Sequence, residues 1–304
     1  MGSIFRSILL SAVAACFCGC IGGVVKEIDV VYGRPGGQDI KMDVFRSAEK
    51  PDKLRPAVIL VHGGAWSAGD KSECHPFAEY LAKQGYVSFC IGYRLVNDTG
   101  NRWPAQLDDV QRAIRWIRAN SAKYGVDPDR IGAIGGSAGG HIVACLGTSD
   151  TRDNSDPELA KYSSRPTCVV MMCGPTDLTE DLSKKVKQGE WCNEQIRRLL
   201  GDKPDSVPEV ARAASPLFHV DSKAVPTLIV QGENDDIVPV DHAERFAEAL
   251  KKAGVEYKLF VHKGGHGFDD GDDFANFVKG NDVFLKKHLL DSPSAVPAPS
   301  EKKE

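Results

Sequence analysis

The chain has 304 residues, of which 42% are hydrophobic, 26% charged and 8% aromatic, and its formal net charge is −4. This composition is that of an ordinary globular protein, and it is sufficient for one large α/β domain with a sizeable core. Positive and negative residues are interspersed, and no basic stripe combines with aromatic residues, which argues against a nucleic-acid partner. The sequence also contains no tandem repeat of solenoid or propeller length.

The first twenty residues have the features of an export signal. Arg6 precedes an apolar run over residues 8–15, which is too short to cross a bilayer as a stable helix but matches the core of a signal peptide. The run ends in Val13-Ala14-Ala15-Cys16, which resembles a bacterial lipobox. We therefore expect residues 1–20 to be a signal peptide and the protein to be exported, as a periplasmic or outer-surface lipoprotein attached to the membrane through a lipidated Cys16. Cleavage after Ala14 or Ala15 without a lipid would instead give a secreted protein, and a buried N-terminal helix is the remaining alternative.

The chain has nine cysteines, three of which lie at this junction: Cys16, Cys18 and Cys20. Their spacing is compatible with metal binding, but no cluster of histidines or carboxylates follows, and no metal site is expected. Three further cysteines lie in apolar segments and are expected in the core: Cys90, Cys145 and Cys168. An oxidising compartment would permit a disulfide that involves Cys74, Cys173 or Cys192, but the sequence does not fix the pairing.

Two β segments, over 24–32 and 39–46, flank the turn-rich residues 33–37. Their alternation of apolar and polar residues predicts an antiparallel edge of a sheet. The apolar run 57–61, which leads to Gly63-Gly64, predicts a strand that is buried on both faces. A helix over 76–84 and a second buried strand over 87–91 follow.

Pro104 begins a helix that is expected to end near Tyr124, because proline is tolerated in the first turn. Four apolar residues at three- and four-residue steps give this helix one buried face: Leu107, Val110, Ile114 and Ile117. Gly125 is a suitable C-cap. A short strand over 131–134 leads directly into Gly135-Gly136-Ser137-Ala138-Gly139, and a helix then extends to about Leu146.

Later strands are predicted over 168–172, 227–230 and 257–261, with a helix over 240–253 between the last two. Strands that alternate with helices imply right-handed crossovers and a mainly parallel, doubly wound sheet. The long polar stretch 175–214 interrupts this alternation, and we interpret it as a small cap inserted over the site. The catalytic domain is thus expected over 23–290, and the residues 291–304 are expected to form a disordered tail.

The G-x-S-x-G sequence around Ser137 stands between a predicted strand and a predicted helix. In that context the serine is held on a sharp, strained turn with its hydroxyl exposed, as in the nucleophile turn of α/β hydrolases. The glycines at 135 and 139 allow the chain to pass close to itself. The alternative, a glycine-rich turn with an incidental serine, does not account for this context. Ser137 is therefore the candidate nucleophile.

A serine nucleophile needs a base, and His266 is the candidate. It lies in the glycine-rich segment 263–268, just after the last predicted strand, where a loop could bring its imidazole over the serine. His262 competes with it, but a position at the end of the strand suits packing better than catalysis.

The acid that orients the histidine is expected in the segment 231–239, after the preceding strand. Glu233, Asp235 and Asp236 all stand there, and acidic residues are also favoured as caps of the helix that begins near Pro239. Position alone does not choose between Asp235 and Asp236.

Residues 62–66, His-Gly-Gly-Ala-Trp, follow an earlier buried strand. Glycines there let backbone N–H groups approach a substrate, so we assign the amides of Gly64, Ala65 and Ala138 as the oxyanion hole. His62 is expected to brace this loop. Trp66 is either a core residue or a wall of the substrate pocket, and the pocket wall is slightly favoured.

These segments together resemble the bacterial esterases related to hormone-sensitive lipase, and more closely the group of feruloyl-esterase and acetylxylan-esterase-like hydrolases. The matching segments, in family order, are 62–66, 93–95, 104–109, 135–141, 174–178, 232–239 and 265–268. The resemblance implies an α/β-hydrolase fold, and its pattern G-x-x-D-x-x-V-P selects Asp235 as the acid. Two departures are Ala65, where many relatives have a third glycine, and the lack of a large N-terminal cap. His141 matches the family and is expected to be structural.

The expected reaction is acyl transfer by a serine carboxylesterase with the triad Ser137, His266 and Asp235, without metal or organic cofactor. The resemblance implies short-chain acyl esters as substrates, including acetyl or feruloyl esters on plant polysaccharide, so the expected partner is a small-molecule or carbohydrate ester. An amide or formamide hydrolase is the first alternative, because kynurenine formamidase is similar around 62–64. A non-catalytic binding protein that keeps a hydrolase fold is the second. It is disfavoured because every catalytic role is filled.

Overall fold

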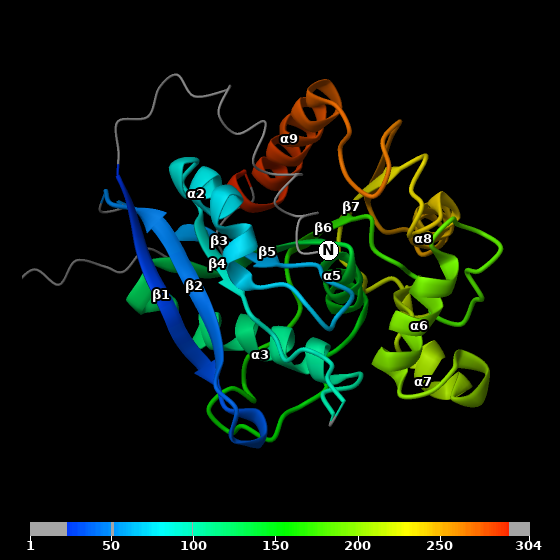
Figure 1. The fold of residues 1–304 in the computed structure, drawn as a ribbon. Coiled ribbons are helices and arrows are strands. Elements are labelled where there is room, and N and C mark those ends of the chain that lie inside the picture. Colours follow the sequence, from blue (N-terminus) through cyan, green and yellow to red (C-terminus); the bar gives the residue numbers. More distant parts are fainter. Residues whose placement is uncertain (1–22, 50–51, 99, 292–304) are drawn as a thin grey trace, which may run out of the picture.

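An eight-stranded sheet crosses the described part of the chain, with helices on both of its faces (Figure 1). The computed structural model describes residues 23–49, 52–98 and 100–291. The strands are β1 Val24–Gly33, β2 Ile40–Ser47, β3 Arg55–Val61, β4 Val87–Ile91, β5 Val126–Gly136, β6 Cys168–Met172, β7 Thr227–Gly232 and β8 Tyr257–His262. They lie in the order β1-β2-β4-β3-β5-β6-β7-β8.

Only the first two strands break the parallel arrangement of the sheet. β1 pairs with β2, and β2 with β4, in antiparallel register, whereas every other neighbouring pair is parallel. The antiparallel edge and the mainly parallel sheet predicted from the sequence are both confirmed. Because the strands from β3 to β8 run in one direction, the loops at their carboxyl ends meet along one edge of the sheet.

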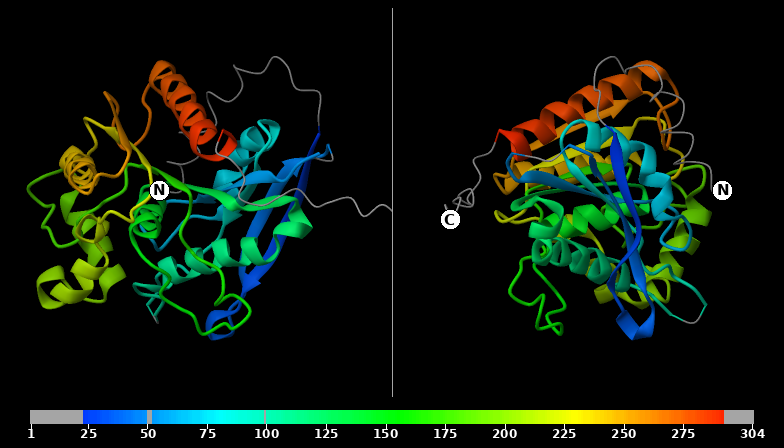
Figure 2. Two further views of the ribbon diagram at one scale, coloured as in Figure 1. Left: turned by 180° about the vertical axis from the view of Figure 1, so that it is seen from behind. Right: turned by 90° about the vertical axis from the view of Figure 1, so that its left-hand side faces the viewer.

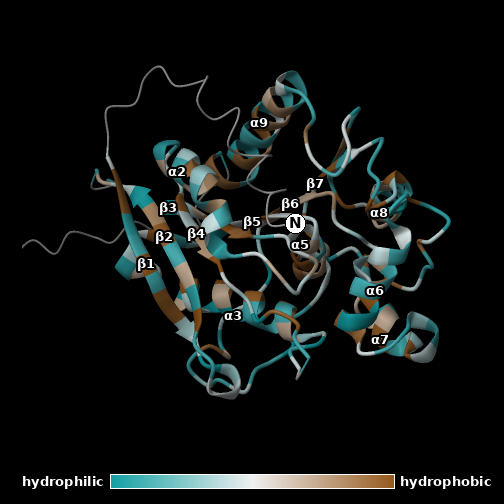
Figure 3. Cartoon of the chain, in the orientation of Figure 1, coloured by the Kyte–Doolittle hydropathy of each residue, from teal (hydrophilic) through white to brown (hydrophobic). Residues whose placement is uncertain are grey.

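The centre of the sheet is buried on both faces. Every residue of β4 is buried, as is every residue of β3 after Arg55. These strands therefore show as largely apolar in Figure 3, whereas the helices carry both apolar and polar residues. A continuous apolar run is what a strand with helices on both sides requires.

Helices pack against each face and make two separate core clusters. The helices are α2 His75–Lys83, α3 Ala105–Ala119, α4 Ser121–Tyr124, α5 Ala138–Thr148, α6 Gly189–Leu200, α7 Pro208–Ala213, α8 Val240–Lys252 and α9 Gly271–Leu285. One cluster includes buried side chains of α3, α5 and α8, and the other includes those of α2 and α9. Figure 2 shows α2 and α9 on one side of the sheet and α3 and α5 on the other, so the doubly wound arrangement is confirmed.

The helix predicted over 104–124 is present but is interrupted at Asn120. This residue leaves helical geometry (φ −106°, ψ 15°), and its side-chain amide donates to the carbonyl of Trp116 at 2.8 Å, which ends α3 and starts α4. Gly125 is a left-handed C-cap (φ 65°), as expected.

Helix α9 was not predicted from the sequence. Its N-cap is Asp270, whose carboxylate accepts from the amide of Asp273 at 2.8 Å. Phe274, Phe277 and Phe284 bury its inner face against the sheet. A π-helical turn over Lys286–Leu290 continues it.

The stretch 175–214 contains α6 and α7 and lies beside α8, at the right in Figure 1. The amide of Gln188, just before α6, donates to the carbonyl of Asp236 at 2.9 Å. This contact ties the stretch to the loop after β7, where the acid of the site was expected.

The six cysteines of the described segments are all buried and free, so the disulfide that an oxidising compartment would permit is not formed between them. The helices of the described segments are all too short or too polar to cross a membrane. The predicted signal peptide with Cys16 lies outside the described residues, as does the predicted tail beyond Asp291.

Candidate active site

Ser137 stands on a sharp turn between β5 and α5. Its backbone is in a conformation that side chains rarely adopt (φ 55°, ψ −122°). A Cβ atom at Gly135 would lie 2.3 Å from the carbonyl oxygen of Gly139, and one at Gly139 would lie 2.1 Å from that of Val61. The chain thus passes so close to itself that only glycine fits on either side of the serine, as the sequence predicted.

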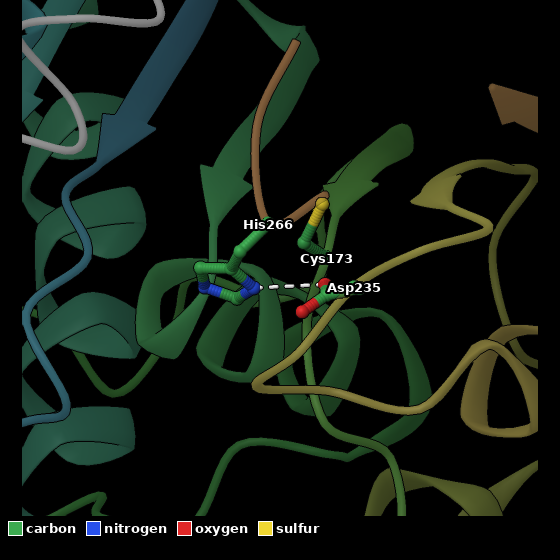
Figure 4. Close-up of side chains that lie close together, drawn as sticks. All are labelled: Cys173, Asp235 and His266. Atoms are coloured by element: carbon green, nitrogen blue, oxygen red, sulfur yellow. Dashed lines mark hydrogen bonds and ion pairs between the residues drawn. The ribbon is translucent and has the colours of Figure 1, made fainter. Parts of the chain in front are cut away.

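His266 lies between Ser137 and Asp235 and contacts both. Its Nε2 atom is 2.8 Å from the Ser137 hydroxyl oxygen. Its Nδ1 atom is 2.8 Å from a carboxylate oxygen of Asp235, a contact drawn in Figure 4. The competing His262 packs its ring against Phe268 at 4.5 Å between centroids. The structure therefore brings together the three residues that the sequence singled out and leaves His262 in a packing role.

Asp235 is held rigidly by its own loop. One carboxylate oxygen accepts from the amides of Ile237 and Val238 at 2.8 and 2.9 Å, and the other accepts from the side chain of Gln231 at 2.8 Å. Asp236 faces α6 instead, where it accepts from the side chain of Gln188 at 2.9 Å. The geometry therefore distinguishes Asp235 from Asp236, which their positions in the sequence could not do.

Cys173 lies beside Asp235 and His266. From the sequence it was a candidate only for a disulfide. Its sulfur, a carboxylate oxygen of Asp235 and a ring nitrogen of His266 all lie within 4.8 Å of one another (Figure 4). Burial, and secondly the charge of Asp235, raise the pKa of the Cys173 thiol. The thiol therefore stays protonated and is not a competing nucleophile.

The predicted oxyanion loop has an irregular backbone. Gly64, Ala65 and Trp66 have φ values of 107°, 50° and 59°, and a Cβ atom at Gly64 would lie 2.2 Å from the carbonyl oxygen of Ala68. Among the described residues, the amides of Gly64 and Ala65 find no acceptor. Both residues border the same cavity as Ser137 and His266, so these two N–H groups are available to a ligand.

Trp66 is largely a core residue. It is 4% exposed, and its indole N–H donates to Nδ1 of His141 at 3.1 Å. The other ring nitrogen of His141 donates to the carbonyl of Ala214 at 2.7 Å. Trp66 also borders a small cavity of about 40 Å³ beside Ser137, and it is a pocket wall only in that cavity. His141 links the oxyanion loop to the end of α7, as a structural residue would.

His62 is fully enclosed and braces the loop. Its Nδ1 donates to the carbonyl of Gly63 at 2.8 Å, and its ring stacks on Tyr93 with centroids 4.3 Å apart. Burial lowers the pKa values of His62 and His141 to about 4, so both are neutral at pH 7.

Two cavities meet at Ser137. The larger has a volume of about 500 Å³ and is bordered by His266 and by polar side chains before and on α6, namely Gln188, Gln195 and Arg198. The smaller has a volume of about 40 Å³ and an apolar lining that includes Leu182, Cys192, Ile196 and Val238. Trp191 and Ile237 border both cavities. From the sequence, the residues of α6 were expected only in a cap over the site, and none was assigned to the site itself.

Comparison with known proteins identifies the family of the chain. The BD-FAE family model matches residues 42–250. The chain belongs to the BD-FAE family. The esterase LipC of Mycobacterium tuberculosis is 36% identical over 245 residues, which cover 79% of this chain and 59% of LipC. The chain spans little more than half the length of curated relatives that it matches.

Two solved structures of esterases share the fold of this BD-FAE protein. The butyrate-bound esterase Est2 of Thermogutta terrifontis is 30% identical with a TM-score of 0.73, and the match covers 88% of this chain and 96% of Est2. The acetyl ester-xyloside bifunctional hydrolase of Caldicellulosiruptor lactoaceticus is 30% identical with a TM-score of 0.69, covering 83% and 89%. The α/β-hydrolase fold and the resemblance to bacterial esterases of the acetylxylan-esterase-like group are thereby confirmed.

Proposed function

We propose that the protein is a serine carboxylesterase whose catalytic triad is Ser137, His266 and Asp235. The observation that carries this proposal is the unbroken series of hydrogen bonds from the serine hydroxyl through the imidazole to a buried carboxylate, at the junction of two cavities. An unaided serine hydroxyl is a weak nucleophile at neutral pH, and this series is the arrangement that activates it.

The reaction proceeds in two halves. Ser137 attacks the ester carbonyl while His266 takes the hydroxyl proton on Nε2, and Asp235 keeps the Nδ1–H oriented and stabilises the imidazolium. His266 then gives its proton to the leaving alcohol, which departs. Water next attacks the acyl-enzyme, again with His266 as base, and releases the acid and the free serine.

The amides of Gly64, Ala65 and Ala138 stabilise the negative charge that develops on the carbonyl oxygen. The first two have no acceptor within the described chain, and Ala138 begins α5, whose N-terminus adds partial positive charge. Each such donor is worth about 3–4 kcal/mol in the transition state.

The two cavities differ in a way that suggests which ester is cleaved. The apolar cavity of about 40 Å³ beside Ser137 suits an acetyl group and is far too small for a feruloyl group. The larger, partly polar cavity suits an alcohol of the size of a sugar. The two similar structures, a butyrate-bound esterase and an acetyl ester-xyloside bifunctional hydrolase, agree with a short acyl chain. We therefore propose acetyl esters of carbohydrates as the substrate class.

A panel of p-nitrophenyl esters of increasing acyl length, with acetylated xylan and a feruloylated oligosaccharide, tests this proposal. We expect kcat/KM to be highest for acetate, to fall with each added methylene, and to be lost in Ser137→Ala. N-formylkynurenine is the control for the formamidase alternative. Turnover of that amide alone, or full activity of Ser137→Ala, would refute the esterase assignment.

We also propose that residues 1–20 direct export and that Cys16 is lipidated. The support is the sequence of the segment alone, which lies outside the described residues. Mass spectrometry of the mature N-terminus tests it, because an unmodified Met1 would exclude cleavage and a start at residue 15 or 16 without lipid would exclude the anchor.

A further inference from the structure

Three different metal-binding side chains meet beside the proposed base. Cys173 directly follows β6, Asp235 lies in the loop after β7, and His266 lies in the loop after β8. Because these neighbouring strands are parallel, their carboxyl ends bring the three side chains to one place (Figure 4). The sulfur, a carboxylate oxygen and a ring nitrogen all lie within 4.8 Å of one another.

We propose that Cys173, Asp235 and His266 form an inhibitory binding site for a thiophilic divalent cation such as Zn²⁺. Sulfur, nitrogen and oxygen are the donors that Zn²⁺ takes, at bond lengths of about 2.0–2.3 Å. Two donors bound to one ion are therefore at most about 4.6 Å apart. The separations in the free protein are close to that limit, so small side-chain movements suffice for one ion to contact all three.

An ion can enter from the larger cavity if the loop of His266 moves. The side chain of Asp235 is fully buried and Cys173 is 6% exposed, and neither borders that cavity. His266 does border it and is carried by a loop that contains Gly264, Gly265 and Gly267. Glycines give this loop the freedom to adjust around an ion. The fourth position of a tetrahedral ion would take water.

Binding of the ion removes the base. A metal on Nδ1 leaves the neutral imidazole with its proton on Nε2, the nitrogen that faces the Ser137 hydroxyl at 2.8 Å. In that tautomer Nε2 donates a hydrogen bond and cannot accept the serine proton. The Cys173 thiol loses its proton to solvent as the metal–sulfur bond forms, so one proton is released and nothing is oxidised.

Inhibition kinetics test the site. Hydrolysis of p-nitrophenyl acetate is measured against Zn²⁺ for the unmodified chain and for Cys173→Ala. No hydrogen bond joins the thiol to Asp235 or His266 in the described structure, so basal activity should persist. We expect the half-inhibitory Zn²⁺ concentration to rise at least about tenfold in the variant, because a ligand is lost.

Two controls make the result specific. Cys168→Ala removes a fully buried cysteine at the start of the same strand and should leave the Zn²⁺ inhibition unchanged. Mg²⁺, which prefers oxygen donors, should not inhibit at the same concentrations. Equal Zn²⁺ inhibition of the unmodified chain and Cys173→Ala would overturn the proposal, as would a lack of inhibition of the unmodified chain.

The inhibition rests on the proposed esterase function, but the binding does not, and a second measurement separates them. Cd²⁺ is titrated into the full chain carrying Ser137→Ala, and the ultraviolet absorption of the cadmium–thiolate bond is recorded. We expect the absorption to decrease when Cys173→Ala is added. An unchanged absorption would exclude the metal site, whether or not the protein is an esterase. A decrease in absorption, together with a lack of esterase activity in the unmodified chain, would refute only the proposed function.

Discussion

Asp235 accepts four hydrogen bonds, from two backbone amides, from Gln231 and from His266. In Asp235→Asn one carboxylate oxygen becomes an NH2 group, which cannot accept a hydrogen bond. If the NH2 group faces His266, the imidazole loses its acceptor. If it faces Ile237 and Val238, their amides lose theirs. We predict that kcat falls about 10⁴-fold, as the loss of the correct histidine tautomer does in serine proteases. Steady-state kinetics on p-nitrophenyl acetate measures the change.

Asp236→Asn is the matched control for this variant. Its side chain contacts Gln188 and not His266. We expect kcat to change by no more than about threefold, since this hydrogen bond is half-exposed and replaceable by water. A loss in Asp236→Asn as large as that in Asp235→Asn would show that the hydrogen-bond geometry does not identify the acid.

At the scale of single residues, the sequence predicts best those roles that depend on the conformation of the local backbone. Ser137 and its glycines are recognisable because the close approach of the chain permits no side chain on either flank. The choice of Asp235 over Asp236 required a family resemblance, because it depends on how the turn directs each carboxylate. Cys173 was missed as a neighbour of the triad because no local pattern records that the ends of β6, β7 and β8 meet.

The turn between β5 and α5 allows a sharp test at the scale of one element. In Gly139→Ala the new Cβ atom would lie 2.1 Å from a backbone oxygen of β3, which no side-chain movement can relieve. We predict a loss of about 3 kcal/mol or more in the free energy of unfolding, the range that severe overpacking causes. Denaturant unfolding measures it.

Gly271→Ala is the control for this substitution. Gly271 begins α9, and a Cβ atom there meets nothing within 4 Å. Alanine should be neutral or slightly stabilising, since it favours a helix more than glycine does. Equal losses in both variants would show that the turn around Ser137 has no special steric constraint.

Helix α6 separates the two cavities through Trp191, which borders both. In Trp191→Ala the cavity of about 40 Å³ should open into the larger one and accept longer acyl chains. We predict that the ratio of kcat/KM for hexanoate over acetate rises about tenfold or more, because each methylene accommodated in an apolar pocket is worth roughly 1–3 kcal/mol. Kinetics on the two p-nitrophenyl esters gives this ratio.

Trp116→Ala provides the comparison for Trp191→Ala. Trp116 is a partly buried tryptophan of α3 that borders neither cavity. The ratio should not change in this variant. If Trp191→Ala also leaves the ratio unchanged, the small cavity does not hold the acyl group.

Elements with a strong periodic pattern are the ones that the sequence predicts. The continuous apolar runs of β3 and β4 and the buried face of α3 were all found in this way. Helix α9 was missed because its residues 271–285 include an internal glycine and two asparagines, which lower helix propensity. Its packing against the sheet, through Phe274 and Phe277, supplies the stability that local propensity does not.

For the molecule as a whole, the site is a consequence of the parallel sheet. Ser137, Cys173, Asp235 and His266 come after β5, β6, β7 and β8, which are consecutive neighbours in the sheet. The alternation of strands and helices predicted a mainly parallel sheet but not the order of its strands. The sequence could not predict how α6 would lie over the edge, because long polar insertions carry no pattern that specifies their docking.

The stability of the whole molecule should depend on pH, and two fully buried histidines contribute to this dependence. His62 and His141 are neutral and buried in the folded state, with pKa values lowered from 6.5 to about 4 by desolvation. The unfolded chain binds protons on both between pH 6.5 and 4, whereas the folded chain does not. This stabilisation is therefore complete above pH 6.5 and is lost as pH falls toward 4, by about 3 kcal/mol for each histidine over the whole range.

His62→Asn tests this dependence, because the asparagine amide can replace Nδ1 as donor to the carbonyl of Gly63. We predict that the slope of the free energy of unfolding against pH, measured by denaturant titration between pH 6.5 and 4, falls by about 1.4 kcal/mol per pH unit, the contribution of one proton. The slope is independent of any constant loss of stability in the variant. An equal slope in His62→Asn and in the unmodified chain would mean that His62 takes up its proton without unfolding. Its enclosure would then be looser than its hydrogen bond to Gly63 and its stacking on Tyr93 imply.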